Sequence, residues 1–465
     1  MTEDSLLSPS WAGTEVSSLT GDQALLAALL EVEATWGEIL AEAGYADPTD
    51  AQALRGIASD LQSVPGLAPA ELAPAAVGGG NPVIPMLAAL RSELKASGPG
   101  DSARDSALHR GATSQDILDT ALVLLVHRAG AQMLADGHAA ATALAALAEK
   151  HRGTVCAARS LTQHALPTVF GLRAATWLDG VAAALTDLEQ SLHRLPLQWG
   201  GAAGTQAALV DFAGADGARS LTDQLAARLG LPASRRPWHV QRQPLLQVAS
   251  AAAGLSSALG KAAGDVLTLQ RPEIAELREP AAAGRGGSSA MPHKQNPVLS
   301  TLIRSAALST PAQLSTLYSA AAMAQDERPD GGWHAEWAPL RELLRLTGGA
   351  ADRARELFGG LVVDPQQMER NLRLSGDLVL SERLMAVLGP QLPGGKEQLT
   401  QLVSRSVQEG VSLRDLVAES FAHAGVAEPE QIEALFDPAD YLGRAQEFID
   451  SSVEEFKEQH DQRTL

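Results

Sequence analysis

The feature that most constrains the fold is a long apolar stripe that follows Pro244. Its members recur at alternating steps of three and four residues: Leu245, Val248, Ala252, Leu255, Leu259, Ala262, Val266 and Leu269. This spacing aligns them on one side of an α-helix of about 27 residues, about 40 Å long at 1.5 Å per residue. No charged residue lies between Gln243 and Gly260, so we expect more than one face of the helix to be buried. The sequence therefore predicts a left-handed bundle of long helices.

Composition supports an all-α fold with three helical domains. Aromatic residues make up only 4% of the 465 residues and alanine is abundant, which favours packed helices over sheets. We expect an N-terminal helical domain at 1–105, which ends near the Gly and Pro cluster at 97–100. A central long-helix bundle is expected at 106–355. A C-terminal helical domain is expected at 356–465, where charge returns and prolines shorten the helical patterns.

The formal net charge of -19 argues against nucleic acid or an anionic membrane as a partner, because both attract basic surfaces. No uninterrupted apolar run reaches the roughly 18 residues of a membrane span, and the N-terminus lacks the basic start of a secretory signal. The single cysteine, Cys156, excludes an internal disulfide and fits a reducing compartment. We therefore expect a cytoplasmic protein that attracts small anions only through a local basic cluster.

Residues 284–297 form such a cluster. Three glycines and two prolines make a regular helix or strand impossible there, and Arg285 and Lys294 occur without any Asp or Glu. The last two residues, Asn296 and Pro297, are typical of a helix N-cap and a first helical residue. Because the free N–H groups of a helix N-terminus favour negative charge, the sequence predicts an anion-binding loop.

The second half of this loop, Ser288 to Pro297 (SSAMPHKQNP), resembles the signature segment of the fumarase/aspartase superfamily. The resemblance implies that Ser288 is the catalytic acid and base. It also implies that a catalytic Lys294, together with Asn296, holds the carboxylate next to the reacting carbon. The other binding residues implied in this segment are Ser289 and Met291. A free serine is too weak a base, so N–H groups of the loop and nearby cations would have to stabilise its alkoxide.

A second segment, His109 to Asp116 (HRGATSQD), precedes an apolar helical pattern. Thr113 and Asp116 have the spacing of a capping box, which predicts a well-capped helix start. The segment also resembles the HxGxTSxD segment of the superfamily. That resemblance implies that Thr113 and Ser114 hydrogen-bond a substrate carboxylate and that His109 is a polar contact.

A third segment, Arg159 to Pro167 (RSLTQHALP), resembles the superfamily segment RTHxQxAxP. Leu161 occupies the place of the histidine that fumarases and adenylosuccinate lyases use as an acid. Gln163 matches the pattern, and His164 is an addition that serves either a structural role or substrate recognition. An amine or hydroxide leaving group needs a proton donor, whereas a carboxylate does not. Leu161 therefore favours a reaction in which a carboxylate leaves or adds.

Three further segments, at 200–205, 238–242 and 328–337, resemble bacterial 3-carboxy-cis,cis-muconate cycloisomerases. This resemblance implies the lactonisation of 3-carboxy-cis,cis-muconate to 4-carboxymuconolactone in protocatechuate (β-ketoadipate) catabolism. The reaction would pass through an aci-carboxylate intermediate and use no cofactor. Since the substrate is a tricarboxylate, further cations are needed; the candidates are Arg159, Arg285 and Arg328.

Two alternatives remain open. One is an adenylosuccinate lyase-type C–N lyase, a class that shares the SSAMPHK motif, but Leu161 counts against it. A catalytically silent helical scaffold is the other, and the intact Ser288 and Lys294 count against that. No metal site is expected, because the histidines lack HxxxH spacing and Cys156 stands alone. The resemblance further implies a homotetramer whose active sites are shared between subunits.

Overall fold

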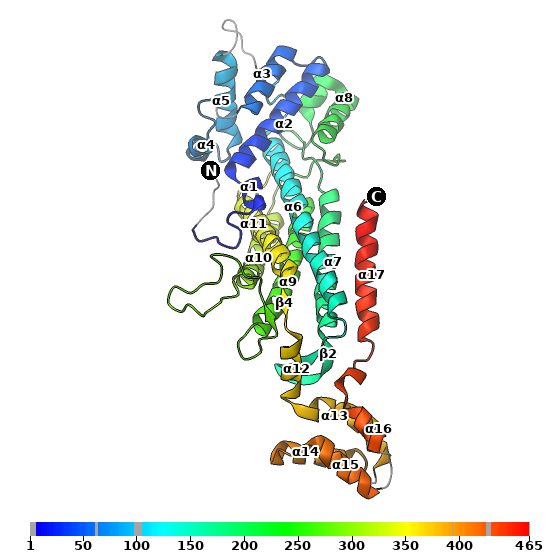
Figure 1. The fold of residues 1–465 in the computed structure, drawn as a ribbon. Coiled ribbons are helices and arrows are strands. Elements are labelled where there is room, and N and C mark those ends of the chain that lie inside the picture. The colour runs from blue at the N-terminus through cyan, green and yellow to red at the C-terminus, as the bar shows by residue number, and fades with distance from the viewer. Residues whose placement is uncertain (1–5, 61–63, 97–104, 393, 425–428, 465) are drawn as a thin grey trace. The chain divides into compact units, whose positions relative to one another are not determined.

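The chain folds almost entirely into α-helices, which confirms the all-α prediction (Figure 1). The computed structural model describes residues 6–60, 64–96, 105–392, 394–424 and 429–464. Two compact units divide the chain. Unit 1 comprises Met1–Gly137, Ala183–Gly260 and Leu302–Arg353, and unit 2 comprises His138–Ala182, Lys261–Thr301 and Ala354–Leu465. The division into three consecutive domains stays a prediction.

Long helices contribute residues to both units. They are α6 (Ser114–Lys150), α7 (Phe170–His193), α9 (Gln243–Leu269), α10 (Val298–Ala322) and α11 (Gly332–Gly359). Helix α9 has the length and the start that the apolar stripe predicts, and Ala252, Leu255 and Leu259 on that stripe are fully buried. The sequence pattern therefore identified a core helix correctly.

Within unit 1, a glycine lets two of these helices pack closely. A Cβ atom added to Gly137 of α6 would lie 2.5 Å from Leu185 Cδ2 of α7, closer than real Cβ atoms approach. Gly130, two turns earlier, meets Leu192 of α7 in the same way. Small residues thus set the short distance between α6 and α7.

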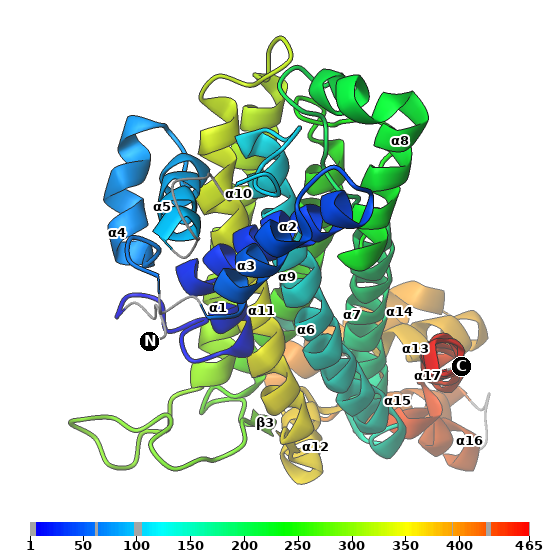
Figure 2. The ribbon, with the colours of Figure 1, turned by 90° about the horizontal axis from the view of Figure 1, so that it is seen from above.

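The remaining helices of unit 1 are shorter. They are α1 (Glu15–Leu19), α2 (Asp22–Glu42), α3 (Pro48–Ser59), α4 (Pro69–Ala75), the 3₁₀ turn η2 (Ala76–Gly78), α5 (Val83–Ala96) and α8 (Ala207–Arg228). Helix α2 lies beside α3, and both views of the ribbon show them together (Figures 1 and 2). Trp36 of α2 is fully buried and donates its Nε1–H to Arg110 O at 2.8 Å, which ties α2 to the segment before α6.

Unit 2 contains a β-hairpin that the helical patterns did not predict. Strands β1 (Val155–Ser160) and β2 (Gln163–Val169) pair antiparallel, with Val155 opposite Val169 and Ser160 opposite Gln163. The two-residue loop between them, Leu161 and Thr162, has φ angles of 49° and 72°. Two positive φ angles are typical of the type I′ turn, which matches the twist of a hairpin. A second pair, β3 (Leu277–Arg278) and β4 (Val362–Val363), is shorter.

The other elements of unit 2 follow β4. They are α12 (Pro365–Arg373), η3 (Gly376–Leu380), α13 (Ser381–Val387), η4 (Gly389–Gln391), α14 (Gly395–Glu409), α15 (Leu413–Ala424), α16 (Pro429–Glu433), η5 (Ala434–Phe436), η6 (Pro438–Asp440) and α17 (Ala445–Thr464). Leu384, Leu399, Val417 and Phe421 belong to one buried cluster, which gives these short helices a common core.

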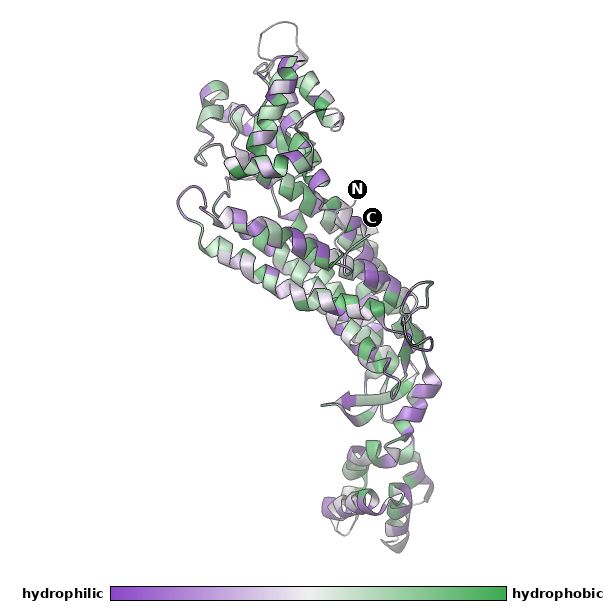
Figure 3. Cartoon of the chain, turned by 90° about the vertical axis from the view of Figure 1, so that its left-hand side faces the viewer, coloured by the Kyte–Doolittle hydropathy of each residue, from purple (hydrophilic) through white to green (hydrophobic). Residues whose placement is uncertain are grey.

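Hydrophobic residues recur along the long helices (Figure 3). Within the described parts of the chain, α6 is long and apolar enough to cross a membrane by length and composition alone, and α4 to η2 with α5 would qualify only as one sharply bent span. Most of the apolar stretch of α6 is buried inside the protein. Burial by other helices accounts for its composition, as in the core helix of a bundle.

Candidate functional site

The loop at residues 281–297 follows β3 and leads into α10, and it extends as an open loop in both ribbon views (Figures 1 and 2). Asn296 N donates to Gly286 O at 2.8 Å, which closes the loop at its base. Gly286 has a φ of 72°, and a Cβ atom there would lie 2.7 Å from Asn296 O. Only glycine fits this position without a shift of the backbone. Ser288 is half-buried within the loop, whereas Ser289, Met291 and Lys294 are exposed.

The hydroxyl of Ser288 accepts two backbone hydrogen bonds. The N–H groups of Ala290 and Met291 point to its Oγ at 3.4 and 3.2 Å. Donors aimed at this oxygen would interact more strongly with an alkoxide than with a hydroxyl. The loop backbone thus supplies the kind of donors that an acid/base serine requires.

Asn296 does not cap the helix that follows, so the predicted N-cap is wrong. Helix α10 begins at Val298, and its first N–H groups bind a carboxylate from a residue nearly twenty positions earlier. Leu299 N and Ser300 N donate to the Glu279 carboxylate at 3.0 and 2.7 Å. Glu279 therefore occupies the helix N-terminus that was expected to attract a substrate anion.

Two of the predicted binding arginines in unit 2 already hold protein carboxylates. Arg159 donates two hydrogen bonds to Glu276, at 3.1 and 2.5 Å, and Glu276 is fully buried. Asn371 Nδ2 donates to the same carboxylate at 2.8 Å. Arg285 Nη2 pairs with Glu356 at 2.7 Å. These ion pairs were not predicted, because both carboxylates lie far away in sequence.

The hairpin carries the remaining predicted residues of unit 2. His164 Nδ1 lies 3.0 Å from Ser375 Oγ, and burial together with the neighbouring Arg159 lowers the pKa of His164, with Glu276 opposing. His164 is therefore mostly neutral at pH 7. Gln163 is exposed, and Leu161 at the turn is 94% exposed. An apolar side chain thus occupies an open position at the turn, at the place of the histidine in the segment RTHxQxAxP that this stretch resembles.

In unit 1 the structure brings Thr113 and Arg328 together. The Arg328 guanidinium donates to Thr113 Oγ1 and, through Nε, to Ala202 O at 3.2 Å. Thr113 and Ser114 lie at the start of α6, where both are half-buried. Arg328 contacts hydroxyl and carbonyl oxygens but no carboxylate in the described structure. Its charge is available to an anion at this helix start.

Asp116 organises this helix start. Its fully buried carboxylate accepts hydrogen bonds from Thr113 N at 3.0 Å, Gly200 N at 2.7 Å and Gly201 N at 2.8 Å, and from His239 Nε2 at 2.8 Å. The bond from Thr113 N confirms one half of the predicted capping box; in the other half, Asp116 N binds the carbonyl oxygen of Thr113 instead of its hydroxyl. The three other bonds attach the glycine segment and the segment at 238–242 to α6, which the sequence spacing alone could not show.

His109, the predicted polar contact, is already paired. It has a positive φ of 57°, its Nδ1 lies 2.7 Å from Glu33 Oε1, and its N donates to Glu33 Oε2 at 3.0 Å. Glu33 is fully buried in α2. The carboxylate fixes both the backbone and the ring of His109, so that one ring nitrogen remains for a ligand.

A buried charge network lies one turn further along α6. Arg242 binds Asp119 at 2.7 Å through Nη1 and Glu336 at 3.1 Å through Nε, and Trp333 Nε1 donates to Asp119 at 2.9 Å. One cation faces two carboxylates here. Burial raises the pKa of Glu336, Arg242 lowers it and Asp119 raises it, and together they bring the pKa to about 7. Glu336 therefore exchanges a proton near neutral pH.

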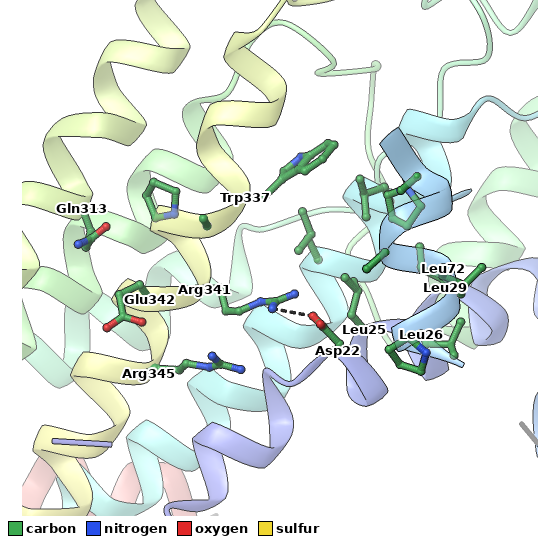
Figure 4. Close-up of a pocket in the computed structure, with 18 residues that line it drawn as sticks. Asp22, Leu25, Leu26, Leu29, Leu72, Gln313, Trp337, Arg341, Glu342 and Arg345 are labelled. Atoms are coloured by element: carbon green, nitrogen blue, oxygen red, sulfur yellow. Dashed lines mark ion pairs between the residues drawn. The ribbon is translucent and has the colours of Figure 1, made fainter. Parts of the chain in front are cut away.

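A largely apolar pocket of about 610 Å³ lies elsewhere in unit 1 (Figure 4). It is lined by Leu25 and Leu29 of α2, Leu72 of α4 and Trp337 of α11, and Arg341 pairs with Asp22 at 2.6 Å across it. None of the predicted site residues lines this pocket. Within the described residues, no three His, Cys, Asp or Glu side chains form a group that could hold a metal ion.

Comparisons with known proteins agree with this combination of helical fold and signature segments. Residues 85–310 match the family model described as Lyase. The chain is 45% identical over 461 residues to the nitrosuccinate lyase of Streptomyces davaonensis, which covers 97% of this chain and 94% of that protein. It is 40% identical over 397 residues to the 3-carboxy-cis,cis-muconate cycloisomerase of Pseudomonas aeruginosa, which covers 83% of each.

A solved structure agrees as well. The crystal structure of the 3-carboxy-cis,cis-muconate lactonizing enzyme from Pseudomonas putida matches with a TM-score of 0.88 and 32% identity, over 98% of this chain and 99% of that chain. An all-α fold with the three signature segments defines a class of lyases and cycloisomerases. The chain belongs to the fumarase/aspartase superfamily, and its relatives include 3-carboxy-cis,cis-muconate cycloisomerases.

Proposed function

We propose that this protein is a lyase that removes a proton from the carbon next to a carboxylate while a weakly basic group leaves the neighbouring carbon. The substrate we propose is nitrosuccinate. Loss of one proton and of the nitro group as nitrite leaves an unsaturated C4 dicarboxylate, so that atoms and charges balance. The nitrosuccinate lyase that covers 97% of the chain at 45% identity supports this substrate.

The observation that carries the proposal is the number of cations without an acidic partner. Of the predicted site residues, Arg159 is paired with Glu276 and Arg285 with Glu356. In the described structure, Lys294 and Arg328 are the two cations of this set that contact no carboxylate. Two available cations match a dicarboxylate better than a tricarboxylate.

Leu161 supports the same class of reaction. Nitrite, like a carboxylate, is a weak base and departs without a proton from a general acid. The exposed Leu161 cannot supply that proton. A C–N lyase that expels an amine would need such a donor, which makes an adenylosuccinate lyase-type reaction a poorer match.

The residues take the following roles. Ser288, with the Ala290 and Met291 N–H groups directed at its Oγ, removes the proton. Lys294 and Asn296 hold the carboxylate that becomes an aci-carboxylate. Arg328, Thr113 and Ser114 hold the second carboxylate. We infer a cytoplasmic homotetramer, in which segments from different subunits complete each site.

The second candidate is the reaction predicted from the sequence, the cycloisomerisation of 3-carboxy-cis,cis-muconate in β-ketoadipate catabolism. The cycloisomerase relative at 40% identity and the absence of an acid at Leu161 favour it. Its third carboxylate would have to displace Glu276 from Arg159 or Glu356 from Arg285, which costs an ion pair.

One assay separates these reactions. Purified protein is mixed in turn with nitrosuccinate, 3-carboxy-cis,cis-muconate and adenylosuccinate, while ultraviolet absorbance and released nitrite are measured. With nitrosuccinate we expect nitrite to be released. The amount of nitrite should equal the amount of new double bond that the gain of absorbance measures. Faster loss of diene absorbance from 3-carboxy-cis,cis-muconate would instead identify the cycloisomerase. Size-exclusion chromatography with light scattering tests the tetramer.

A further inference from the structure

A cavity of about 380 Å³ that several charged side chains line lies in unit 2 between the β1–β2 hairpin, α7 and α9. Its walls carry three cationic side chains, Arg159, Arg173 and Lys261, and one acidic side chain, Asp265. Thr176 of α7 also lines it. The cavity combines a small volume with more cationic than acidic side chains, in a protein whose net charge is -19.

Two of the three cations have close acidic partners. Arg159 holds the buried Glu276 through two hydrogen bonds. Lys261 pairs with Asp265 at 2.5 Å on the same face of α9, and Trp177 Nε1 donates to that carboxylate at 2.7 Å. These two charges are therefore largely compensated.

Arg173 is the cation that remains. Its closest carboxylate oxygen, Glu276 Oε2, is 3.9 Å from Nη1 and already accepts a hydrogen bond from Arg159 at 3.1 Å. Arg173 Nη1 is buried and has no hydrogen-bond partner, and Nη2 makes one long bond of 3.4 Å to Ala157 O. The side chain is only 17% exposed. A cation that has left water without a full set of partners is costly, unless a ligand completes the set.

We propose that this cavity binds a compact oxyanion, with the Arg173 guanidinium as its principal contact. A phosphate or a short carboxylate has the charge and the acceptor oxygens that Arg173 lacks, and both are small enough for about 380 Å³. Because Glu276 compensates Arg159 and Asp265 compensates Lys261, the charge of Arg173 is the positive charge that this cavity leaves for an anion. This site is additional to the proposed nitrosuccinate site, because the cavity contains neither Ser288, Lys294 nor Arg328.

The neighbouring Thr176 permits a test that does not depend on removing a half-buried side chain. Thr176 is exposed and lies one helical turn after Arg173 on α7, where i and i+3 side chains meet. In Thr176→Glu, a tethered carboxylate takes the place of the anion. In Thr176→Gln, a side chain of the same size brings no charge, so it is the matched control. Arg173→Met removes the contact itself.

Binding of inorganic phosphate, and separately of succinate, is measured by isothermal titration calorimetry and by thermal shift at constant ionic strength. We expect that at least one of the two anions binds the wild-type protein and raises its Tm, as a ligand of the native state must. Thr176→Glu and Arg173→Met should weaken that binding about tenfold or more. Thr176→Glu should also raise the Tm of the ligand-free protein, whereas Thr176→Gln should bind as the wild type does.

A Lys294→Ala variant separates this cavity from the proposed active site. Binding that survives in Lys294→Ala and is lost in Thr176→Glu supports the cavity, whichever anion is bound. Binding that is lost in Lys294→Ala and kept in Thr176→Glu overturns it, as does the absence of binding by both anions. Because these measurements follow binding and not turnover, their outcome does not depend on whether nitrosuccinate is the substrate.

Discussion

His239 Nε2 lies 2.8 Å from Asp116 Oδ1, and both side chains are buried. The same carboxylate accepts the N–H groups of Gly200 and Gly201, and Gly201 O is 3.4 Å from the Arg328 guanidinium. The pair thus fixes the glycine segment against α6, and that segment in turn supports Arg328. We treat His239 as a positioning residue, since it acts through other groups.

His239→Leu should loosen the glycine segment and with it Arg328. Because Arg328 is proposed to hold the carboxylate away from the reacting carbon, the KM for nitrosuccinate should rise about tenfold while kcat falls less. His239→Gln, whose amide can still donate to Asp116, should restore the wild-type KM in large part. Steady-state kinetics measure both values. Equal loss of kcat in both variants, with unchanged KM, would contradict a positioning role.

Ser288→Ala should lower kcat by about 10²- to 10⁴-fold, because the group proposed to transfer the proton is removed. The KM should change little, since Lys294, Arg328 and Thr113 remain to hold the carboxylates. Ser289→Ala in the same loop is the comparison variant: Ser289 is predicted to bind substrate, so the KM should rise while most of kcat is kept, because the described loop directs N–H groups at Ser288 Oγ and not at Ser289. Turnover near the wild-type level in Ser288→Ala would contradict the proposed role of Ser288 in proton transfer.

Leu161→Ala should leave kcat and its dependence on pH close to those of the wild type. The reason is that nitrite leaves without a proton donor, so the side chain at this position takes no part in proton transfer. The pH profile of kcat between pH 6 and 9 checks this. A kcat at least tenfold lower in Leu161→Ala would show that the hairpin loop contributes to the reacting site after all.

Glu336 predicts how stability depends on pH. Its pKa is raised to about 7 in the folded protein, from 4.5 as the ordinary value, chiefly by burial. The unfolded chain therefore gives up this proton at lower pH than the native protein does. The stability associated with the protonated form is fully present below about pH 4.5 and is lost as the pH rises through about 7, by an amount on the order of 3 kcal/mol.

Glu336→Gln removes this titration while keeping the size of the side chain. Urea unfolding of both proteins between pH 5 and 8 measures the effect. The free energy of unfolding of the wild type, minus that of Glu336→Gln, should fall as the pH rises. A constant difference across this range would mean that Glu336 does not change its protonation state there.

Structural features that depend only on residues close together in the sequence were predicted correctly. The stripe from Leu245 to Leu269 identified α9, because helical periodicity depends only on the spacing of apolar residues within one segment. The spacing of Thr113 and Asp116 identified the capping bond at the start of α6 for the same reason. The segments that resemble the superfamily predicted its all-α fold as well, because each of them is a continuous run of residues.

Contacts between residues that are far apart in the sequence were not predicted. Asn296 was expected to cap α10, but the cap is Glu279, which competes successfully because a carboxylate binds two N–H groups at once. Arg159 and Arg285 were expected to be open to substrate, and each is paired with a carboxylate that only folding brings close. The hairpin at 155–169 was not predicted. Strand formation depends on packing against the partner strand, so it gives only a weak pattern in a single sequence.

The turn that carries Leu161 has an evolutionary consequence. Leu161 has a φ of 49°, a conformation in which histidine is found more often than leucine, and its side chain is 94% exposed. Replacing this leucine by histidine would demand no repacking of the interior. One substitution that the fold would not oppose would therefore place a proton-donating side chain at this turn, the kind of group that a more basic leaving group requires.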